Sequence, residues 1–250
     1  MNYNTIEFSE YKSYGILWLN QPQNLNALSP AMLDELLQFF SKEPSKDLRF
    51  LIVCGRGKCF GAGGDLKAML SMSQEGAEKV SRMAHETFGL IRKYPIPVIA
   101  GIHGFAVGGG LELAMACDVA FATNDAWFSL PELQFSMLPG GGGTVRFTQR
   151  VGYQNAFWHL LSADKIIASQ ALQLGIIQKL FPPDNFETTI IETLQKVIIP
   201  IEKEAVFLMK QQIAEVSELV QQNFDNEAQR FSYLLNRYAK EKINMFFNKE

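Results

Sequence analysis

The chain has 250 residues, of which 47% are hydrophobic and 20% are charged, with 19 Gly, 10 Pro and 3 Cys. These values are those of an ordinary globular protein, long enough to bury a sizeable core without disulfides or a structural metal. Lys and Arg number 23 against 26 Asp and Glu, so the net charge of −3 gives no electrostatic case for nucleic acid or an anionic membrane surface as a partner.

The three cysteines, Cys54, Cys59 and Cys117, form no C-x-x-C pair, and their odd number predicts free thiols in a reducing compartment. No basic start followed by an apolar stretch opens the chain, and no uncharged apolar run reaches the roughly 18 residues that a spanning helix needs. The sequence therefore predicts a cytoplasmic protein with neither a membrane nor a nucleic acid among its partners.

Short apolar, β-branched runs alternate with helical stretches as far as Phe181. In chain order we expect a strand at 15–19, a helix at 30–40 with Ser29 as its N-cap, a strand at 50–54, a helix at 75–93, a strand at 97–102, a helix at 110–117 and a strand at 118–122. This alternation predicts an α/β chain with mainly parallel strands.

From Phe186 onward the sequence is almost free of Gly and Pro. Residues 201–213 and 227–247 carry apolar side chains on one face of a 3.6-residue period, which predicts a helical C-terminal region. No linker rich in Gly or Ser separates the parts, so we expect residues 1–185 and 186–250 to pack as one body.

Glycine-rich stretches raise the possibility of a nucleotide site, but their spacing is wrong. The run from Gly61 begins as G-x-G and has Leu66 where a dinucleotide fingerprint needs its third glycine. Lys58 is followed by Cys59 where a P-loop needs Ser or Thr. G-x-S-x-G and H-E-x-x-H motifs are absent from the sequence, which removes the usual support for a serine hydrolase or a zinc protease.

Two glycine-rich turns can expose backbone amides instead. The run Gly108-Gly109-Gly110 follows a predicted strand and leads into a helix start, where the first amides are free to bind an anion. The segment 61–64 follows the strand at 50–54 and can present a second amide in the same way. Two convergent N–H groups would form an oxyanion hole.

Two glutamates accompany these turns. Glu112 lies in the first turn of the predicted helix, and Glu132 follows a proline in an otherwise apolar, aromatic stretch. A carboxylate among aromatic side chains is a candidate for a raised pKa, which suits a general acid or base near neutral pH. The simpler interpretation makes Glu112 a charge favoured by the helix dipole and Glu132 a solvated turn residue.

Six segments of the chain share a recognisable pattern with a known family. They are Asn24-Leu-Asn-Ala-Leu28, Phe60-Gly-Ala-Gly-Gly-Asp-Leu66, the run from Ile96 to Asp118, Phe128-Ser-Leu-Pro-Glu132, Leu138-Pro-Gly-Gly-Gly-Gly-Thr144 and Ala168-Ser-Gln-Ala-Leu-Gln-Leu-Gly175. Together they resemble the crotonase (enoyl-CoA hydratase/isomerase) superfamily over roughly residues 5–183. The resemblance implies a spiral of ββα units over residues 1–185 and a helical region at 186–250 that serves oligomerisation and pocket closure, in trimers or dimers of trimers.

The resemblance implies roles for four residues. The amides of Gly64 and Gly109 would hold the thioester carbonyl of an acyl-CoA, Glu112 would act as base on a water molecule, and Glu132 would exchange the proton at C2. Because members that only isomerise or decarboxylate often lack one glutamate, the pair favours a hydratase of 2-enoyl-CoA. Coenzyme A is then part of the substrate, with no separate cofactor and no metal.

Contacts to the substrate are implied at further matching positions. Met69 to Met83 and the C-terminal helices are expected to form part of the pocket wall, which sets specificity. The implied contacts are Asn26, Ala27, Leu28, Lys58, Ala62, Gly63, Asp65, Leu66, Lys67, Gly108, Pro131 and Gly140.

Three departures and two rival functions remain. Gly64 stands where many hydratases have Ala, Val145 replaces a frequent Gln, and the tail lacks the Lys-Arg-x-Pro ending common in the family.

One rival function is another crotonase reaction: double-bond isomerisation, or dehydration of a branched acyl group on CoA or on a carrier protein in polyketide assembly. The other is a non-catalytic, CoA-binding oligomeric scaffold.

Overall fold

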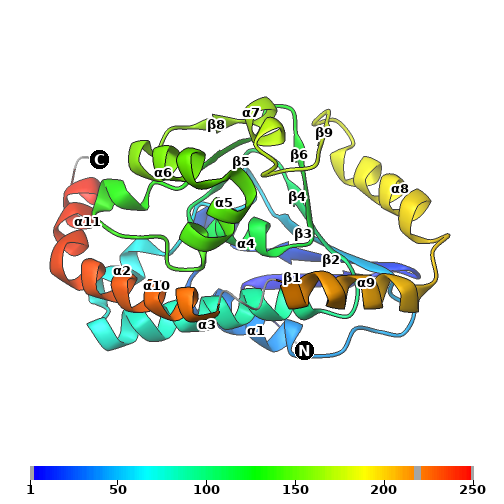
Figure 1. Cartoon of the computed structure of the whole chain (residues 1–250), viewed down its shortest axis with the longest axis horizontal. Coiled ribbons are helices and arrows are strands. Elements are labelled where there is room, and N and C mark those ends of the chain that lie inside the picture. Colours follow the sequence, from blue (N-terminus) through cyan, green and yellow to red (C-terminus); the bar gives the residue numbers. More distant parts are fainter. Residues whose placement is uncertain (1–2, 217–220, 249–250) are drawn as a thin grey trace.

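The computed structural model describes residues 3–216 and 221–248, and it contains two sheets (Figure 1). The larger sheet has the order β1-β2-β3-β4-β6-β9, antiparallel between β1 and β2 and parallel elsewhere. The smaller sheet has the order β5-β7-β8. The strands are β1 (Ile6–Glu10), β2 (Tyr14–Leu19), β3 (Phe50–Gly55), β4 (Val98–Ile102), β5 (Phe105–Val107), β6 (Val119–Thr123), β7 (Trp127–Ser129), β8 (Ile166–Ile167) and β9 (Lys179–Phe181).

Helices connect these strands and then continue alone: no strand follows Phe181 in the described part of the chain. A π-helical segment, η4, joins the last two α-helices without a break. The helices are η1 (Pro22–Asn24), α1 (Pro30–Phe40), α2 (Leu66–Ser71), α3 (Gln74–Lys93), α4 (Gly109–Ala116), η2 (Glu132–Phe135), α5 (Gly143–Val151), α6 (Tyr153–Ser162), α7 (Ala168–Gln173), α8 (Phe186–Ile198), α9 (Lys203–Val216), α10 (Gln221–Leu234), η4 (Leu235–Ala239) and α11 (Lys240–Phe247).

The centre of the larger sheet is buried on both faces. Along β3, Leu51 and Val53 belong to the core shared with α1 and α3, whereas Phe50 and Ile52 belong to the core shared with α8. This alternation follows from the two-residue period of a strand, and a strand covered on both faces reads as one continuous apolar run. The site described below lies on the side of the sheet that α1 and α3 cover.

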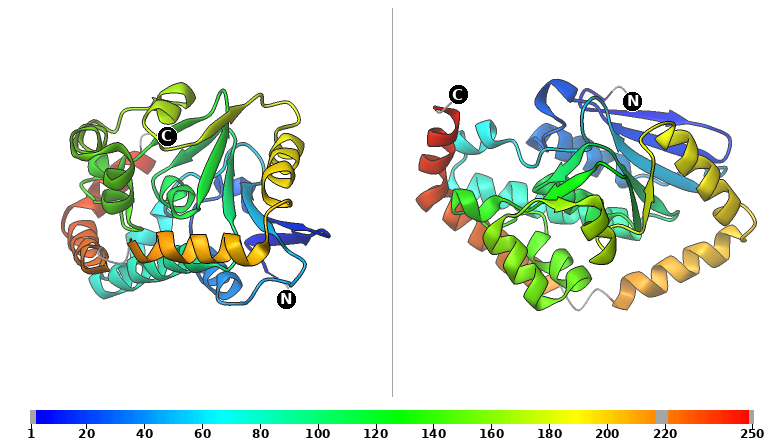
Figure 2. Two further views of the ribbon diagram at one scale, coloured as in Figure 1. Left: turned by 45° about the vertical axis from the view of Figure 1, so that its right-hand side comes forward. Right: turned by 90° about the horizontal axis from the view of Figure 1, so that it is seen from above.

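The C-terminal helices return to the core. Helix α10 packs along α3, and α11 lies against α2 (Figures 1 and 2). A third apolar cluster seals this contact, with Ala77 from α3 beside Phe231 and Leu235 from the returning segment. None of the helices in the described residues is long and apolar enough to cross a membrane.

The predicted α/β class is confirmed, and each predicted strand or helix before Phe181 has a counterpart whose ends agree within about two residues. Ser29 caps α1, its side chain accepting a hydrogen bond from Met32 N at 3.2 Å. The helix expected at 227–247 is instead part of α10, η4 and α11. The predicted division at 185/186 remains a prediction, and of its two ranges residues 1–2, 217–220 and 249–250 lie outside the described residues.

Candidate active site

A pocket of about 740 Å³, counted with the part open to solvent, lies between the core and α10. Its polar wall is formed by the backbone of residues 62–64 and 107–109 and by two carboxylates, Glu112 and Glu132. The rest of the wall is mainly apolar, with side chains from Leu28, Leu33, Leu66, Met69, Val80, Ala84, Phe88, Phe135, Met137 and Phe231.

Two glycine-rich turns meet at this wall because glycine lets their backbones touch. Gly61 forms an isolated bridge with Ala106, and its carbonyl accepts a hydrogen bond from Val107 N at 3.0 Å. A Cβ atom at Gly110 would overlap the backbone of Gly61. The start of α4 is therefore held directly beside the turn 61–64.

The amides of Gly64 and Gly109 lie close together at this junction. A Cβ atom built on Gly109 would lie only 3.5 Å from Gly64 N. The residues that precede them, Gly63 and Gly108, have φ angles of +106° and +51°, which L-residues with side chains rarely adopt. Neither amide donates a hydrogen bond to any of the residues described, 3–216 and 221–248. Two N–H groups are thus left for a ligand in the pocket.

Glu112 projects from the first turn of α4 and is buried, with 3% of its surface exposed. Its Oε1 accepts hydrogen bonds from Gly141 N at 2.8 Å and from Gly143 N at 2.6 Å. Burial and the nearby carboxylate of Glu227 nonetheless raise the Glu112 pKa to about 8. A carboxyl with a pKa this close to neutral is suited to act as a general acid or base.

Glu132 opens η2 and is buried in a different environment. A Cβ atom at Gly108 would lie 2.9 Å from Glu132 Oε1, which places this carboxyl beside the glycine turn 108–110. Its Oε2 is buried and has no hydrogen-bond partner among the described residues. Burial, followed by the charge of Glu112, raises the Glu132 pKa well above its usual range, so this carboxyl holds its proton tightly.

Comparison with known proteins places this chain in a family. The family model for enoyl-CoA hydratase/isomerase matches residues 10–250. The chain belongs to the enoyl-CoA hydratase/isomerase family. This membership confirms the predicted resemblance to the crotonase superfamily, whose members share this fold.

Individual members of the enoyl-CoA hydratase/isomerase family agree with the assignment. The chain is 36% identical over 187 residues to a mitochondrial enoyl-CoA hydratase of Pongo abelii, a match covering 73% of this chain and 63% of that protein. It is 35% identical over 189 residues to a crotonyl-CoA hydratase of Syntrophomonas wolfei, covering 74% and 72%. The structure of an enoyl-CoA hydratase from Bacillus halodurans has the same fold, with a TM-score of 0.90 at 19% identity over 97% and 100% of the two chains.

Most of the substrate contacts predicted for this family member do line the pocket. The pocket is lined by the four predicted catalytic residues, Glu112, Glu132, Gly64 and Gly109, and by seven of the twelve predicted contacts. From the predicted wall segment 69–83, Met69 and Val80 line it. The seven are Leu28, Ala62, Gly63, Leu66, Gly108, Pro131 and Gly140.

The other five predicted contacts lie outside this pocket, and three of them shape the chain around it. Asn26 is fully buried, and its Nδ2 donates to the carbonyls of Arg56 and Cys59. Half-buried Ala27 donates its N–H to Asn24 O. Asp65 caps α2 by accepting from Ala68 N at 3.0 Å.

The two predicted lysines lie apart from each other. Exposed Lys58 borders a separate polar hollow that Arg56 and His103 also line. Lys67, also exposed, holds its ammonium 5.6 Å from the centre of the Phe247 ring. Their roles as CoA contacts therefore remain predictions.

Sequence reasoning missed one carboxylate, Glu227 on α10, which is 3% exposed and lies next to Glu112. The sequence does carry one sign of this residue, because Glu227 lies on the core-facing side of its helix. That side is marked by Phe224, Ala228, Phe231 and Leu235. An acid on the apolar face of a helix needs partners inside the protein.

The described residues contain no group of three or more His, Cys, Asp or Glu side chains arranged to hold a metal ion. The three cysteines, Cys54, Cys59 and Cys117, are buried and unpaired. Burial raises the pKa of the Cys59 thiol to about 11, which leaves it uncharged near neutral pH.

Proposed function

We propose that this protein is an enoyl-CoA hydratase, which adds water reversibly and syn across the C2=C3 bond of a 2-trans-enoyl-CoA to give a 3-hydroxyacyl-CoA. One observation carries the proposal: two unengaged amides and two buried carboxyls of different character border one largely apolar pocket. The names of the relatives, enoyl-CoA hydratase and crotonyl-CoA hydratase, support the same reaction.

The two amides would act on the thioester carbonyl. When the water oxygen bonds to C3, the C2=C3 π electrons move toward the carbonyl oxygen and enolate charge develops there. The N–H groups of Gly64 and Gly109 would donate to that oxygen. Because the donors are held by the backbone before the reaction, they need no reorganisation as the charge forms.

The two carboxyls would divide the proton transfers. Glu112 accepts two backbone hydrogen bonds, which favour its ionised form, so it is suited to take a proton from water. Glu132 has a buried oxygen with no partner in the described chain, which favours its protonated form, so it is suited to deliver a proton to C2. Afterwards Glu112 is protonated and Glu132 ionised, and proton exchange restores the starting state.

Substrate and assembly belong to the same proposal. The apolar wall would accept the acyl group, and coenzyme A would enter as part of the substrate, so that no separate cofactor takes part. We also propose a homotrimer or a dimer of trimers, which exposed apolar side chains of α6 support: Tyr153, Phe157, Trp158 and Leu161 are all more than half exposed.

The direct test is a product assay with purified protein. Hydration of crotonyl-CoA or a longer 2-enoyl-CoA removes the ultraviolet absorbance of the conjugated enoyl thioester, and the product should be a 3-hydroxyacyl-CoA that incorporates one oxygen from labelled water. Conversion of a 3-enoyl-CoA into a 2-enoyl-CoA without uptake of water would show an isomerase instead. Binding of CoA thioesters with no turnover would contradict the proposal in favour of a scaffold.

A further inference from the structure

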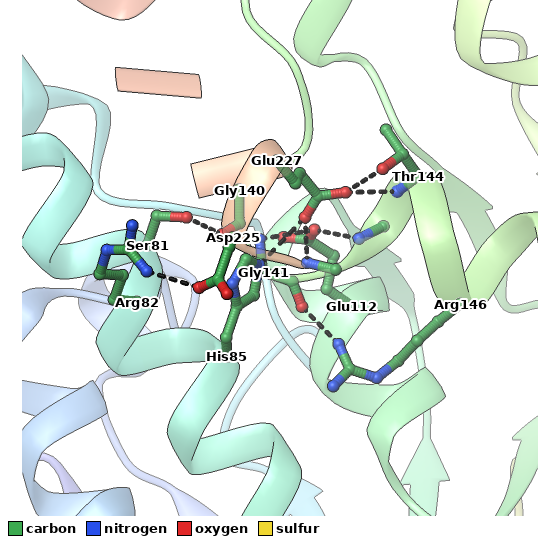
Figure 3. Close-up of polar contacts among 12 residues, drawn as sticks. Ser81, Arg82, His85, Glu112, Gly140, Gly141, Thr144, Arg146, Asp225 and Glu227 are labelled. Atoms are coloured by element: carbon green, nitrogen blue, oxygen red, sulfur yellow. Dashed lines mark hydrogen bonds and ion pairs between the residues drawn. The ribbon is translucent and has the colours of Figure 1, made fainter. Parts of the chain in front are cut away.

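The backbone amides of residues 141–144 donate alternately to two buried carboxylates (Figure 3). The first and third amides of this turn donate to Glu112 Oε1 at 2.8 and 2.6 Å. The second and fourth donate to Glu227 at 2.5 and 3.0 Å. One turn thus joins a carboxylate of the core to a carboxylate of α10.

Further contacts anchor Glu227. The hydroxyl of Thr144 donates to its Oε2, and His85 Nε2 lies 3.1 Å from its Oε1. Figure 3 shows Glu227 reaching from α10 toward Thr144, with His85 of α3 on its other side. Glu227 therefore connects α10, α3 and the start of α5 in a buried polar network.

The network leaves Glu227 outside the reaction space. Glu227 is not part of the pocket wall, whereas Phe231, one helical turn further along α10, is. Glu227 therefore reaches the pocket only through the turn and through its electrostatic effect on Glu112.

Charged groups face Glu112 from three elements. They are Glu132 of η2, Glu227 of α10 and Arg146 of α5, whose guanidinium donates to Gly141 O at 2.6 Å. His85 of α3 faces Glu227. The negative charge of Glu227 adds to burial in raising the Glu112 pKa, and the positive charge of Arg146 acts against both.

We propose that Glu227 is a positioning residue, through which α10 holds the turn 141–144 and so holds the Glu112 carboxylate in its working place. This inference rests on the proposed function, because it takes Glu112 as the base in hydration. It assigns the C-terminal region a part in the chemistry besides covering the pocket.

The substitution Glu227→Gln separates positioning from simple packing. It keeps the side-chain size and removes the charge. The glutamine side chain has one acceptor oxygen, whereas Gly142 and Thr144 now donate to two different oxygens of Glu227. Without that charge the Glu112 pKa falls, so the base stays ionised to lower pH and the acidic limb of the kcat/KM profile moves to lower pH. A packing role alone would lower activity without moving this limb.

The matched control is Asp225→Asn on the same helix. Asp225 pairs with Arg82 of α3 at 2.6 Å, and its side chain is half exposed. This variant removes one carboxylate from the contact between α10 and α3 without touching the turn. We expect it to leave the pH profile and the turn as in the wild type.

The experiment measures the pH profile and the hydrogen exchange of amides 141–144 in the full-length variants. For Glu227→Gln we expect kcat about 10- to 100-fold lower at the wild-type optimum with KM little changed, because a slightly misplaced base reacts slowly. Exchange at Gly142 and Thr144 should be about 10-fold faster or more. Thr144→Val removes the hydroxyl that donates to Glu227 but leaves the charge of Glu227 in place. This variant should speed exchange of the turn amides without moving the acidic limb of the kcat/KM profile.

The proposal is overturned if Glu227→Gln matches Asp225→Asn in both exchange and pH profile. If Glu227→Gln does not fold, as thermal unfolding would show, unchanged exchange in Thr144→Val overturns it. Failure of the proposed function is a separate result. A wild type that hydrates no enoyl thioester would refute the hydratase, while exchange would still decide whether Glu227 holds the turn.

Discussion

Two of the three glycine-rich turns that border the pocket, the turn 61–64 and the turn 141–144, differ in whether the protein itself engages the amides that face the carboxyls and the pocket. In the turn 61–64, the Gly64 amide donates to no described residue, as is also true of Gly109 beside it. In the turn 141–144, all four amides donate hydrogen bonds to the carboxylates of Glu112 and Glu227. Glycine therefore marks where a backbone can be approached closely, but the surrounding side chains decide whether the protein itself engages the exposed amides.

The two turns also differ in how they are supported. The first is held by backbone contact with α4, because no side chain separates Gly61 from Gly110. The second is held by carboxylates that come from distant parts of the chain. Damage to the first should therefore act through sterics, and damage to the second through charge and hydrogen bonding.

The largest effect is expected from the two carboxyls to which the proposed mechanism assigns the proton transfers. Glu112→Gln and Glu132→Gln should each lower kcat for hydration by about 100- to 10,000-fold, because each removes one proton-transfer group of the proposed mechanism while keeping its shape. Steady-state kinetics on a 2-enoyl-CoA would measure the loss. Full activity in both variants would contradict the two-carboxyl mechanism.

The steric support of the first turn is tested by Gly110→Ala. The added methyl group would overlap the Gly61 backbone, which cannot move aside as a side chain can. We expect a loss of about 1–3 kcal/mol in the free energy of unfolding. A loss of up to about 100- to 1,000-fold in kcat should follow as the two amides separate.

Gly89→Ala is the matched control, because a Cβ atom at this position in α3 meets nothing within 4 Å. Chemical denaturation should show this variant unchanged or stabilised by up to about 1 kcal/mol. Equal destabilisation of both variants would argue against the close contact between Gly61 and Gly110.

The next effect is expected from pH, and it is graded rather than a single step. In the proposed mechanism Glu112 must be ionised to accept a proton, and burial together with Glu227 raises its pKa to about 8. The rate of hydration at limiting substrate should therefore fall as the pH drops below about 8, approaching tenfold per pH unit. A profile of kcat/KM between pH 5 and 8 that stayed flat, at about constant rate, would contradict the role of Glu112 as base.

The smallest effect is expected from Gly64→Ala. The new methyl group would meet only the terminal carbon of the flexible Met69 side chain, and the Gly64 N–H would remain. We expect a few-fold change in kcat/KM and a change in unfolding free energy within about 1 kcal/mol. A loss as large as that of Gly110→Ala would show that the turn 61–64 has no room for a side chain.

Much of this site was predictable from local sequence. The strands at 50–54 and 97–102 are continuous apolar runs, and the glycines that follow them mark the two places where amides meet. The short strands β5, β7 and β8 were not predicted, because two or three residues carry too little periodicity. They form by pairing with each other rather than by local preference.

Glu227 shows the limit of such reasoning. Its partners on the turn lie 83 to 85 residues earlier in the chain, and His85 lies 142 residues earlier. Only the folding of α10 back onto α3 brings them together, and no local pattern encodes that return. The side chain of Asn26 holds the loop through the carbonyls of Arg56 and Cys59, a structural role that its motif position did not reveal, and its substrate contact stays a prediction.

The most direct test of the contrast between the turns is to observe their amides while a ligand binds. Isotope-labelled protein would be titrated with a 3-oxoacyl-CoA, a thioester that forms an enolate but has no C2=C3 bond to hydrate, and backbone amides would be followed by NMR. We predict large downfield shifts of the Gly64 and Gly109 amide protons, with little change at Gly142 and Thr144. Unchanged Gly64 and Gly109 signals in the bound state, or equal shifts at all four amides, would contradict the account.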